Sequence, residues 1–189
     1  DRAGRNWDQD LRHWMEAVDA EGALKTITGA NTTEEIGGIL DLYQRQMGNP
    51  AILFDEVTGF PKGHRVLANV LTSVKRINIA LGLPANGSER DLVLWWRDYM
   101  KHAPKFAPEV VTTGALQENV VEGDSIDITS IPTPTWHEHD GGPYIGTGCM
   151  VVMKDPDDNW VNYGAYRVQT HGPKTASVMM SPGRHGRLI

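Results

Sequence analysis

The first hundred residues carry apolar side chains at the spacing of a helix in some stretches and as short buried runs in others. The first stretch predicts a helix, with Asp8 or Asp10 as its N-cap and Gly22 at its end. Its apolar face consists of Leu11, Trp14, Met15 and Val18. The run LKTI at 24–27 then predicts a short strand.

A second helix is indicated by the pair Thr32 and Glu35, which has the spacing of a capping box. Ile36, Ile39, Leu40 and Tyr43 follow as its apolar face. Gly48 marks the place near which this helix should end.

Two apolar runs bounded by glycine and proline, at 51–54 and 65–70, predict buried strands. A helix is expected over about 73–81, and Ser88 with Asp91 predicts the cap of another that runs through Trp95, Trp96 and Tyr99. This half therefore reads as an alternation of helices and strands.

The pattern changes after Pro108, beyond a proline-bearing joint at 101–110. From Val110 onward β-branched and polar residues alternate, which predicts β-sheet. Strands are expected at 144–154 and 160–169, joined by a five-residue turn that implies a bulge or a wide loop, and again at 175–182.

Composition narrows the function classes. The 189 residues carry a net charge of -6, and charged residues make up 22% of them. An acidic chain of this kind is a poor general binder of nucleic acid, and no apolar run has the roughly 18 residues of a membrane helix. One cysteine, Cys149, rules out an intrachain disulfide. With no signal-like start either, we expect a cytoplasmic protein with no nucleic-acid and no membrane partner.

Three other stretches contain groups that could form a site. On a strand, His137 and His139 would share a face and could hold a metal, although a polar loop is the commoner reading. Cys149 lies among apolar residues and reads as a small buried hydrophobe. The stretch GGPYIGTG at 141–148 lacks the spacing of a dinucleotide-binding turn.

The strand at 160–169 is more informative. Asn162, Gly164 and Tyr166 should point to one face, and Tyr163, Ala165 and Arg167 to the other. Asn162 and Arg167 can share one site only if a bulge or bend intervenes. Taken alone, both residues read as structural, while Gly164 and Ala165 would let a flat ligand approach the backbone.

The motifs NYGAYR at 162–167 and SPGRHG at 181–186, with WHEHDGGPYIGTG at 136–148 before them, resemble the UbiD family of reversible decarboxylases that use prenylated FMN. The front of the chain is similar to the opening domain of the same enzymes at 10–27, 50–70 and 80–83.

The resemblance implies an α+β fold in which 1–107 form an N-terminal α/β domain and 108–189 form the start of a split β-barrel that binds the flavin. It also implies that a helical connector and a C-terminal domain are absent. On this basis we expect the 189 residues alone to be an inactive N-terminal portion, whether truncated, proteolysed or a natural short subunit.

The resemblance further implies a site. Asn162 and His185 would bind Mn²⁺ or Mg²⁺ that also holds the flavin phosphate, and K⁺ would lie near the carbonyl groups around Tyr163. Arg167 would stand at the reacting centre as a catalytic residue that also contacts the cofactor. The remaining cofactor-binding positions would be Gly164, Ala165, Tyr166, Pro182 and Arg184.

The implied reaction is reversible, non-oxidative decarboxylation of an aromatic or α,β-unsaturated carboxylic acid, with a flavin prenyltransferase as supplier of the cofactor and a homo-oligomer as the assembled form. A plain FMN-binding or flavin-reductase-like module and a non-catalytic subunit of a decarboxylase complex remain alternatives. Trp136, Trp160 and Tyr144 are pocket candidates, with core packing the safer interpretation.

Overall fold

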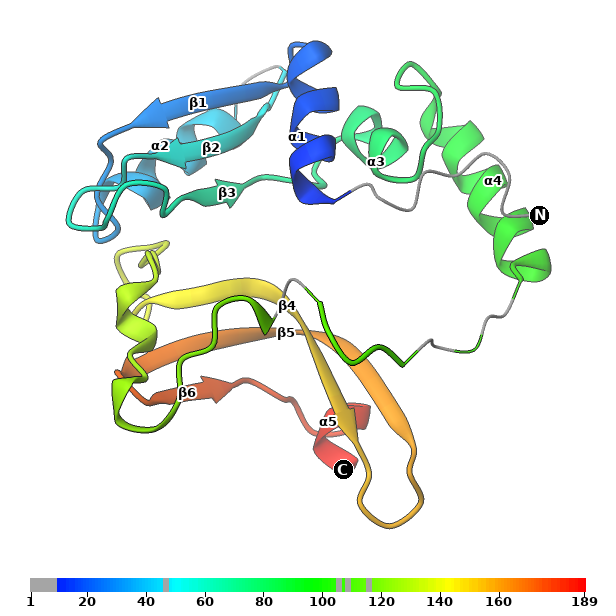
Figure 1. The fold of residues 1–189 in the computed structure, drawn as a ribbon. Helices are drawn as coiled ribbons and strands as arrows, with labels where there is room; N and C mark the ends of the chain where they lie inside the picture. The colour runs from blue at the N-terminus through cyan, green and yellow to red at the C-terminus, as the bar shows by residue number, and fades with distance from the viewer. Residues whose placement is uncertain (1–9, 46–47, 105–106, 108–109, 115–116) are drawn as a thin grey trace. The chain divides into compact units, whose positions relative to one another are not determined.

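The structure is a computed structural model that describes residues 10–45, 48–104, 107, 110–114 and 117–189 (Figure 1). It combines helices with two small sheets, so the mixed helix-and-sheet class is confirmed. Residues 1–26, 43–53 and 67–120 group into one compact unit, and 27–42, 54–66 and 121–189 into a second. The predicted boundary between 107 and 108 stays a prediction, because each unit draws on several stretches of the chain.

Helix α1 spans Leu11–Ala20 and begins as the sequence predicts. The Asp10 side chain accepts hydrogen bonds from the backbone N–H groups of Arg12 and His13, at 2.8 and 3.2 Å. The Arg12 guanidinium, which donates to the Asp10 carboxylate at 2.7 Å, and these backbone bonds lower the pKa of Asp10 to about 2. Asp10 is thus the N-cap, while Asp8 lies outside the described residues.

Helix α2 spans Glu35–Gln44, but its cap differs from the prediction. Asn31 Oδ1 accepts from the backbone N–H groups of Thr33 and Glu34, at 3.0 and 2.9 Å. The Glu35 carboxylate returns the bond by accepting from Asn31 N–H at 2.8 Å. The capping pair is therefore Asn31 with Glu35 rather than Thr32 with Glu35, because the chain makes one extra turn before the helix begins.

The first sheet has the order β1-β2-β3, with β1 at Leu24–Thr28, β2 at Ala51–Asp55 and β3 at Val66–Ala68 (Figure 1). Four consecutive residues of β2 are buried, as expected for a central strand covered on both faces. The predicted strand at 65–70 is shorter in the structure because Asn69 takes a left-handed backbone conformation, with φ of 61°.

Helix α3, Val74–Ala80, lies within the range predicted for it, and α4, Glu89–His102, begins at the cap that the sequence predicts. Ser73 caps the first through Arg76 N–H, and Ser88 with Asp91 forms a capping box on the second. No helix within the described residues is long and apolar enough to cross a membrane.

Arg76 organises the start of α3 from inside the first unit. Its side chain is 1% exposed, and its guanidinium donates to the carbonyl oxygens of Val70, Asn49 and Asn69 at 3.0, 2.7 and 2.9 Å. A fourth bond, of 2.6 Å, reaches Thr72 Oγ1. A buried cation thus satisfies carbonyl groups of two loops that have no regular partners.

The second half is less regular at its start than predicted. From 110 to 143 the described residues form no strand, and 3₁₀ turns occur at Gly123–Ser125 and Ile128–Ser130. Strand β4, Tyr144–Lys154, has the predicted bounds, and β5 runs over Val161–Gly172. The bulges lie within β4, between Tyr144 and Cys149, and a wide turn follows Lys154.

The sheet of the second unit has the order β4-β5-β6, with β6 at Thr175–Val178 (Figure 1). β6 pairs with β5 only from Val168 onward. The chain after β6 continues past the next part of β5, since Met179 N–H donates to the Arg167 carbonyl at 3.1 Å. It ends in α5, His185–Leu188, a short helix that the sequence did not predict.

Replacing Asn31 tests the corrected cap. Asn31→Ala should lower the free energy of unfolding by about 1 kcal/mol, because the N–H groups of Thr33 and Glu34 lose their acceptor. Thr32→Ala is the matched control and should change it by less than about 0.5 kcal/mol. Urea denaturation measures both, and a larger loss in Thr32→Ala would restore the capping pair predicted from sequence.

Arg76→Met should lower the free energy of unfolding by about 3–5 kcal/mol, because the loop carbonyls would be left buried without donors. Lys75→Met, on the same helix, removes only an exposed 3.2 Å ion pair with Glu21. It should cost less than about 1 kcal/mol. Equal losses in the two variants, measured in urea, would contradict the role given to Arg76.

Candidate functional site

Strand β5 keeps the predicted alternation through its first half. Val161 to Tyr166 pair without interruption with Lys154 to Cys149 of β4. Asn162 is buried, at 8% exposed, whereas Tyr163 on the opposite face is 71% exposed. Asn162 and Arg167 therefore lie on opposite faces, and no bulge in β5 brings them to one face.

The segment that ends in α5 lies on the Asn162 face. Gly186 N–H donates to the Tyr166 hydroxyl at 3.1 Å, and the His185 ring meets the Trp160 ring edge-on, with centroids 5.2 Å apart. A Cβ on Gly186 would stand 2.3 Å from Met153 Cε, and Met153 pairs with Asn162 across the ladder. The start of α5 is thus seated over the Met153–Asn162 pair.

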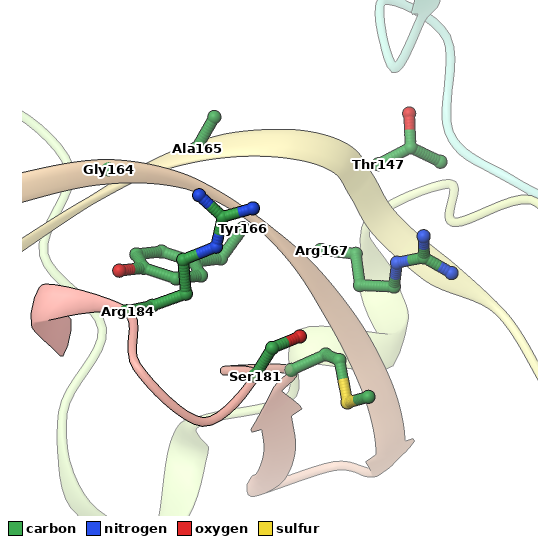
Figure 2. Close-up of a pocket in the computed structure, with 8 residues that line it drawn as sticks. Thr147, Gly164, Ala165, Tyr166, Arg167, Ser181 and Arg184 are labelled. Carbon is green, nitrogen blue, oxygen red and sulfur yellow. The ribbon is translucent and has the colours of Figure 1, made fainter. Parts of the chain in front are cut away.

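A pocket of about 580 Å³ opens between β5 and the segment after β6 (Figure 2). In Figure 2 the Arg184 side chain lies beside Tyr166, while Arg167 reaches toward Thr147. The pocket joins the motifs at 162–167 and 181–186. Its lining residues are Thr147, Gly164, Ala165, Tyr166, Arg167, Met179, Ser181 and Arg184.

Five of the predicted cofactor positions meet in this lining. Asn162, Tyr163, Pro182 and His185 do not line it. Thr147, Met179 and Ser181 were not singled out from the sequence. Thr147 and Ser181 stand inside quoted motifs, so hydroxyl groups next to the glycines were an available signal, whereas Met179 was assigned to a strand that in fact ends at Val178.

The electrostatic character of the pocket follows from its lining. Arg167 and Arg184 supply two guanidinium groups, Ser181 and Thr147 supply hydroxyl groups, and no lining residue carries a carboxylate. A dianionic group such as a phosphate, or a carboxylate, matches this set of donors.

Asn162 carries an unsatisfied group. Its Nδ2 is buried without a hydrogen-bond partner among the described residues. A phosphate oxygen would satisfy this donor, and a half-turn of the amide would present the oxygen to a cation instead. Asn162 and the exposed His185 fit a cation only in part, since no group of three or more His, Cys, Asp or Glu side chains in the described part of the chain is placed to hold one.

The other candidates take less specific positions. His137 and His139 lie in an exposed turn, closed by the 3.0 Å bond from Asp140 N–H to the His137 carbonyl, so the commoner interpretation of them as a polar loop is confirmed. Cys149 is half-buried. The absence of a side chain at Gly164 makes room for the Tyr166 ring, because a Cβ at Gly164 would be 2.7 Å from that ring.

Of the three aromatic pocket candidates, Tyr144 lines a cavity, whereas Trp160 and Trp136 take other positions. Tyr144 lines a smaller cavity of about 290 Å³ that also includes Arg167 and Gln169. Trp160 is 39% exposed and contacts His185, and Trp136 is half-buried. None of the three lies in the fully buried core.

Two protein-family domains match the chain. Residues 15–94 match the 3-octaprenyl-4-hydroxybenzoate carboxy-lyase N-terminal domain, and residues 109–189 match the Rift-related domain of the same carboxy-lyase. The chain belongs to the UbiD family.

The relatives agree with this assignment. The pyrrole-2-carboxylic acid decarboxylase of Pseudomonas aeruginosa is 32% identical over 95% of this chain and 38% of its own length. The closed form of vanillic acid decarboxylase from Sedimentibacter hydroxybenzoicus gives a TM-score of 0.85 at 28% identity, over 95% of this chain and 38% of that one.

The UbiD-class enzyme HmfF from Pelotomaculum thermopropionicum, solved in complex with FMN, gives a TM-score of 0.75 at 26% identity, over 94% of this chain and 38% of that one. An evolved dimeric form of HmfF, solved with prenylated FMN, shares the fold with a TM-score of 0.78 at 24% identity, over 94% of this chain and 39% of that one. The chain thus spans less than two fifths of these relatives.

Asn162→Leu should raise the stability of the ligand-free chain by about 1 kcal/mol, because it removes a buried donor without a partner. Thr170→Val is the matched control, since Thr170 is also buried, at 5% exposed, but donates through its hydroxyl to the Pro143 carbonyl at 3.3 Å. The control should gain no stability. Urea denaturation of both variants without flavin checks the contrast, and a loss of stability in Asn162→Leu would show that Asn162 has a structural partner.

Proposed function

We propose that this chain contributes the flavin-binding part of a decarboxylase that removes CO₂ from an aromatic or α,β-unsaturated carboxylic acid with prenylated FMN. The observation that carries the proposal is the pocket in which Gly164–Arg167 of β5 and Ser181–Arg184 meet with two guanidinium groups and no carboxylate. Membership of the UbiD family and the flavins bound by HmfF support it.

The cofactor answers a chemical need of the reaction. Loss of CO₂ from an sp² carbon leaves an electron pair in the ring plane, and the prenylated flavin supplies the electron sink that the substrate lacks.

The residues of the pocket bind the cofactor and orient the substrate. Arg184 and Ser181 would hold the flavin phosphate, and Arg167 would turn its guanidinium to the substrate carboxylate and orient it. Ala165 leaves the flavin face uncrowded, Pro182 shapes the loop, and the Tyr144 cavity next to Arg167 receives part of the substrate ring.

Cations complete the proposed site. Asn162 and His185 would hold Mn²⁺ or Mg²⁺ at the phosphate, and main-chain carbonyl groups near Tyr163 would hold K⁺. A hard cation there would neutralise phosphate charge in an acidic protein, and the unpaired Asn162 amide supports this assignment.

The sheet β4-β5-β6 would form part of a split β-barrel, completed by residues outside these 189. The assembled enzyme would be a cytoplasmic homo-oligomer supplied by a flavin prenyltransferase. The pocket lining holds no carboxyl group that could return a proton to the product carbon. We therefore propose that the 189 residues alone bind flavin and release no CO₂.

A chimera tests the function. In it, residues 1–189 replace the matching 38% of the P. aeruginosa decarboxylase, and the protein is produced together with a flavin prenyltransferase. We expect bound prenylated flavin, seen by absorption, and CO₂ release from an aromatic acid such as pyrrole-2-carboxylate. Arg167→Ala should reduce the rate by about 10²–10³-fold and keep the flavin.

Arg187→Ala is the matched control, since Arg187 lies in α5 outside the pocket lining, and it should leave the rate unchanged. A chimera that binds unmodified FMN as well as the prenylated form and releases no CO₂ would favour the plain flavin-binding module instead. Equal rates in Arg167→Ala and Arg187→Ala would contradict the role given to Arg167.

A further inference from the structure

Tyr166 fits its place only because two neighbours are glycine. A Cβ on Gly164 would stand 2.7 Å from the Tyr166 ring, and a Cβ on Gly186 would stand 2.7 Å from its hydroxyl. Both distances are shorter than non-bonded contacts allow. The ring therefore lies over Gly164 and directs its hydroxyl toward the start of α5, as Figure 2 shows.

The start of α5 contacts two aromatic side chains, Tyr166 and Trp160. Gly186 N–H donates to the Tyr166 hydroxyl at 3.1 Å, and His185 meets Trp160 at 5.2 Å. Trp160 comes directly before β5 and Tyr166 lies within it, so along the chain the two rings stand on either side of Asn162. His185 contacts the first ring and Gly186 the second.

The segment Arg184–Leu188 contains little regular structure of its own. Arg184 and His185 are exposed, and α5 is a single turn of four residues. A helix of that length does not persist in water without tertiary contacts. The hydroxyl of Tyr166 is accordingly one of the tertiary contacts that fix the segment, together with the buried Gly186 and the ring contact of His185 with Trp160.

We infer that Tyr166 is a positioning residue that docks the segment Arg184–Leu188 on β5 and thereby sets Arg184 and His185 at the phosphate end of the flavin site. The docking of the segment is inferred from contacts within this chain. The statement that the segment faces a flavin phosphate rests on the proposed function. Tyr166 then acts through Arg184 and His185 without contacting the phosphate itself.

The docking can be measured without flavin. Trypsin cleaves after Arg184 only when the segment leaves β5, so Tyr166→Phe should speed that cleavage about three- to tenfold, as loss of one hydrogen bond would. Cleavage after Arg97 in α4 serves as the internal reference and should not change. Tyr43→Phe, which removes a hydroxyl of α2, is the matched control and should leave both rates as they are.

The positioning role is measured with FMN and riboflavin, which differ by the phosphate. Tyr166→Phe should weaken FMN binding about three- to tenfold and leave riboflavin binding unchanged. Equal weakening of both would mean that Tyr166 contacts the flavin ring directly, and unchanged FMN binding despite faster cleavage would mean a structural role only. Either result overturns the inference.

Gly186→Ala supplies an independent variant. It should speed cleavage after Arg184 strongly in the wild-type background and less in Tyr166→Phe, because the clash with the hydroxyl is then gone while the clash with Met153 Cε remains. Additive effects would overturn the docking by Tyr166. If the wild-type chain binds no FMN, the proposed function fails, and the cleavage rates of the variants still decide the docking.

Discussion

The antiparallel ladder between Val161–Tyr166 and Cys149–Lys154 is the constraint on which the site depends. Its unbroken register puts the buried Asn162 on one face and Arg167 on the other. Because β6 pairs only from Val168 onward, the edge of β5 beside this ladder is left to the chain segment that follows β6. The pocket and the α5 docking are both consequences of that edge.

The two units differ in how they satisfy their buried polar groups. The first unit satisfies a buried guanidinium with several acceptors around Arg76, whereas the second leaves the Asn162 amide without a partner in the described chain. An unpaired buried amide lowers the stability of the free protein, and a ligand recovers that cost on binding. Asn162 shares this condition with Asn78 and Trp136, whose side chains also have a buried polar atom without a partner in the described chain.

Local signals predicted much of the fold. Asp10 and Ser88 cap helices as their sequence contexts indicate, and β4 has its predicted bounds. The Asn31 cap was missed because Thr32 offers the better-known spacing. Arg167 and Arg184 could be placed at one pocket only through the family resemblance, since periodicity says nothing about which strand edge stays open. The contacts of Tyr166 with the two glycines depend on tertiary packing, which no local pattern encodes.

The most direct test of the account is a crystal structure of the chain with FMN bound. The account predicts the flavin in the pocket of about 580 Å³, with phosphate oxygens about 3 Å from the Arg184 side chain and the Ser181 hydroxyl. A flavin bound elsewhere, or a phosphate that faces solvent away from Arg184 and Ser181, would contradict it.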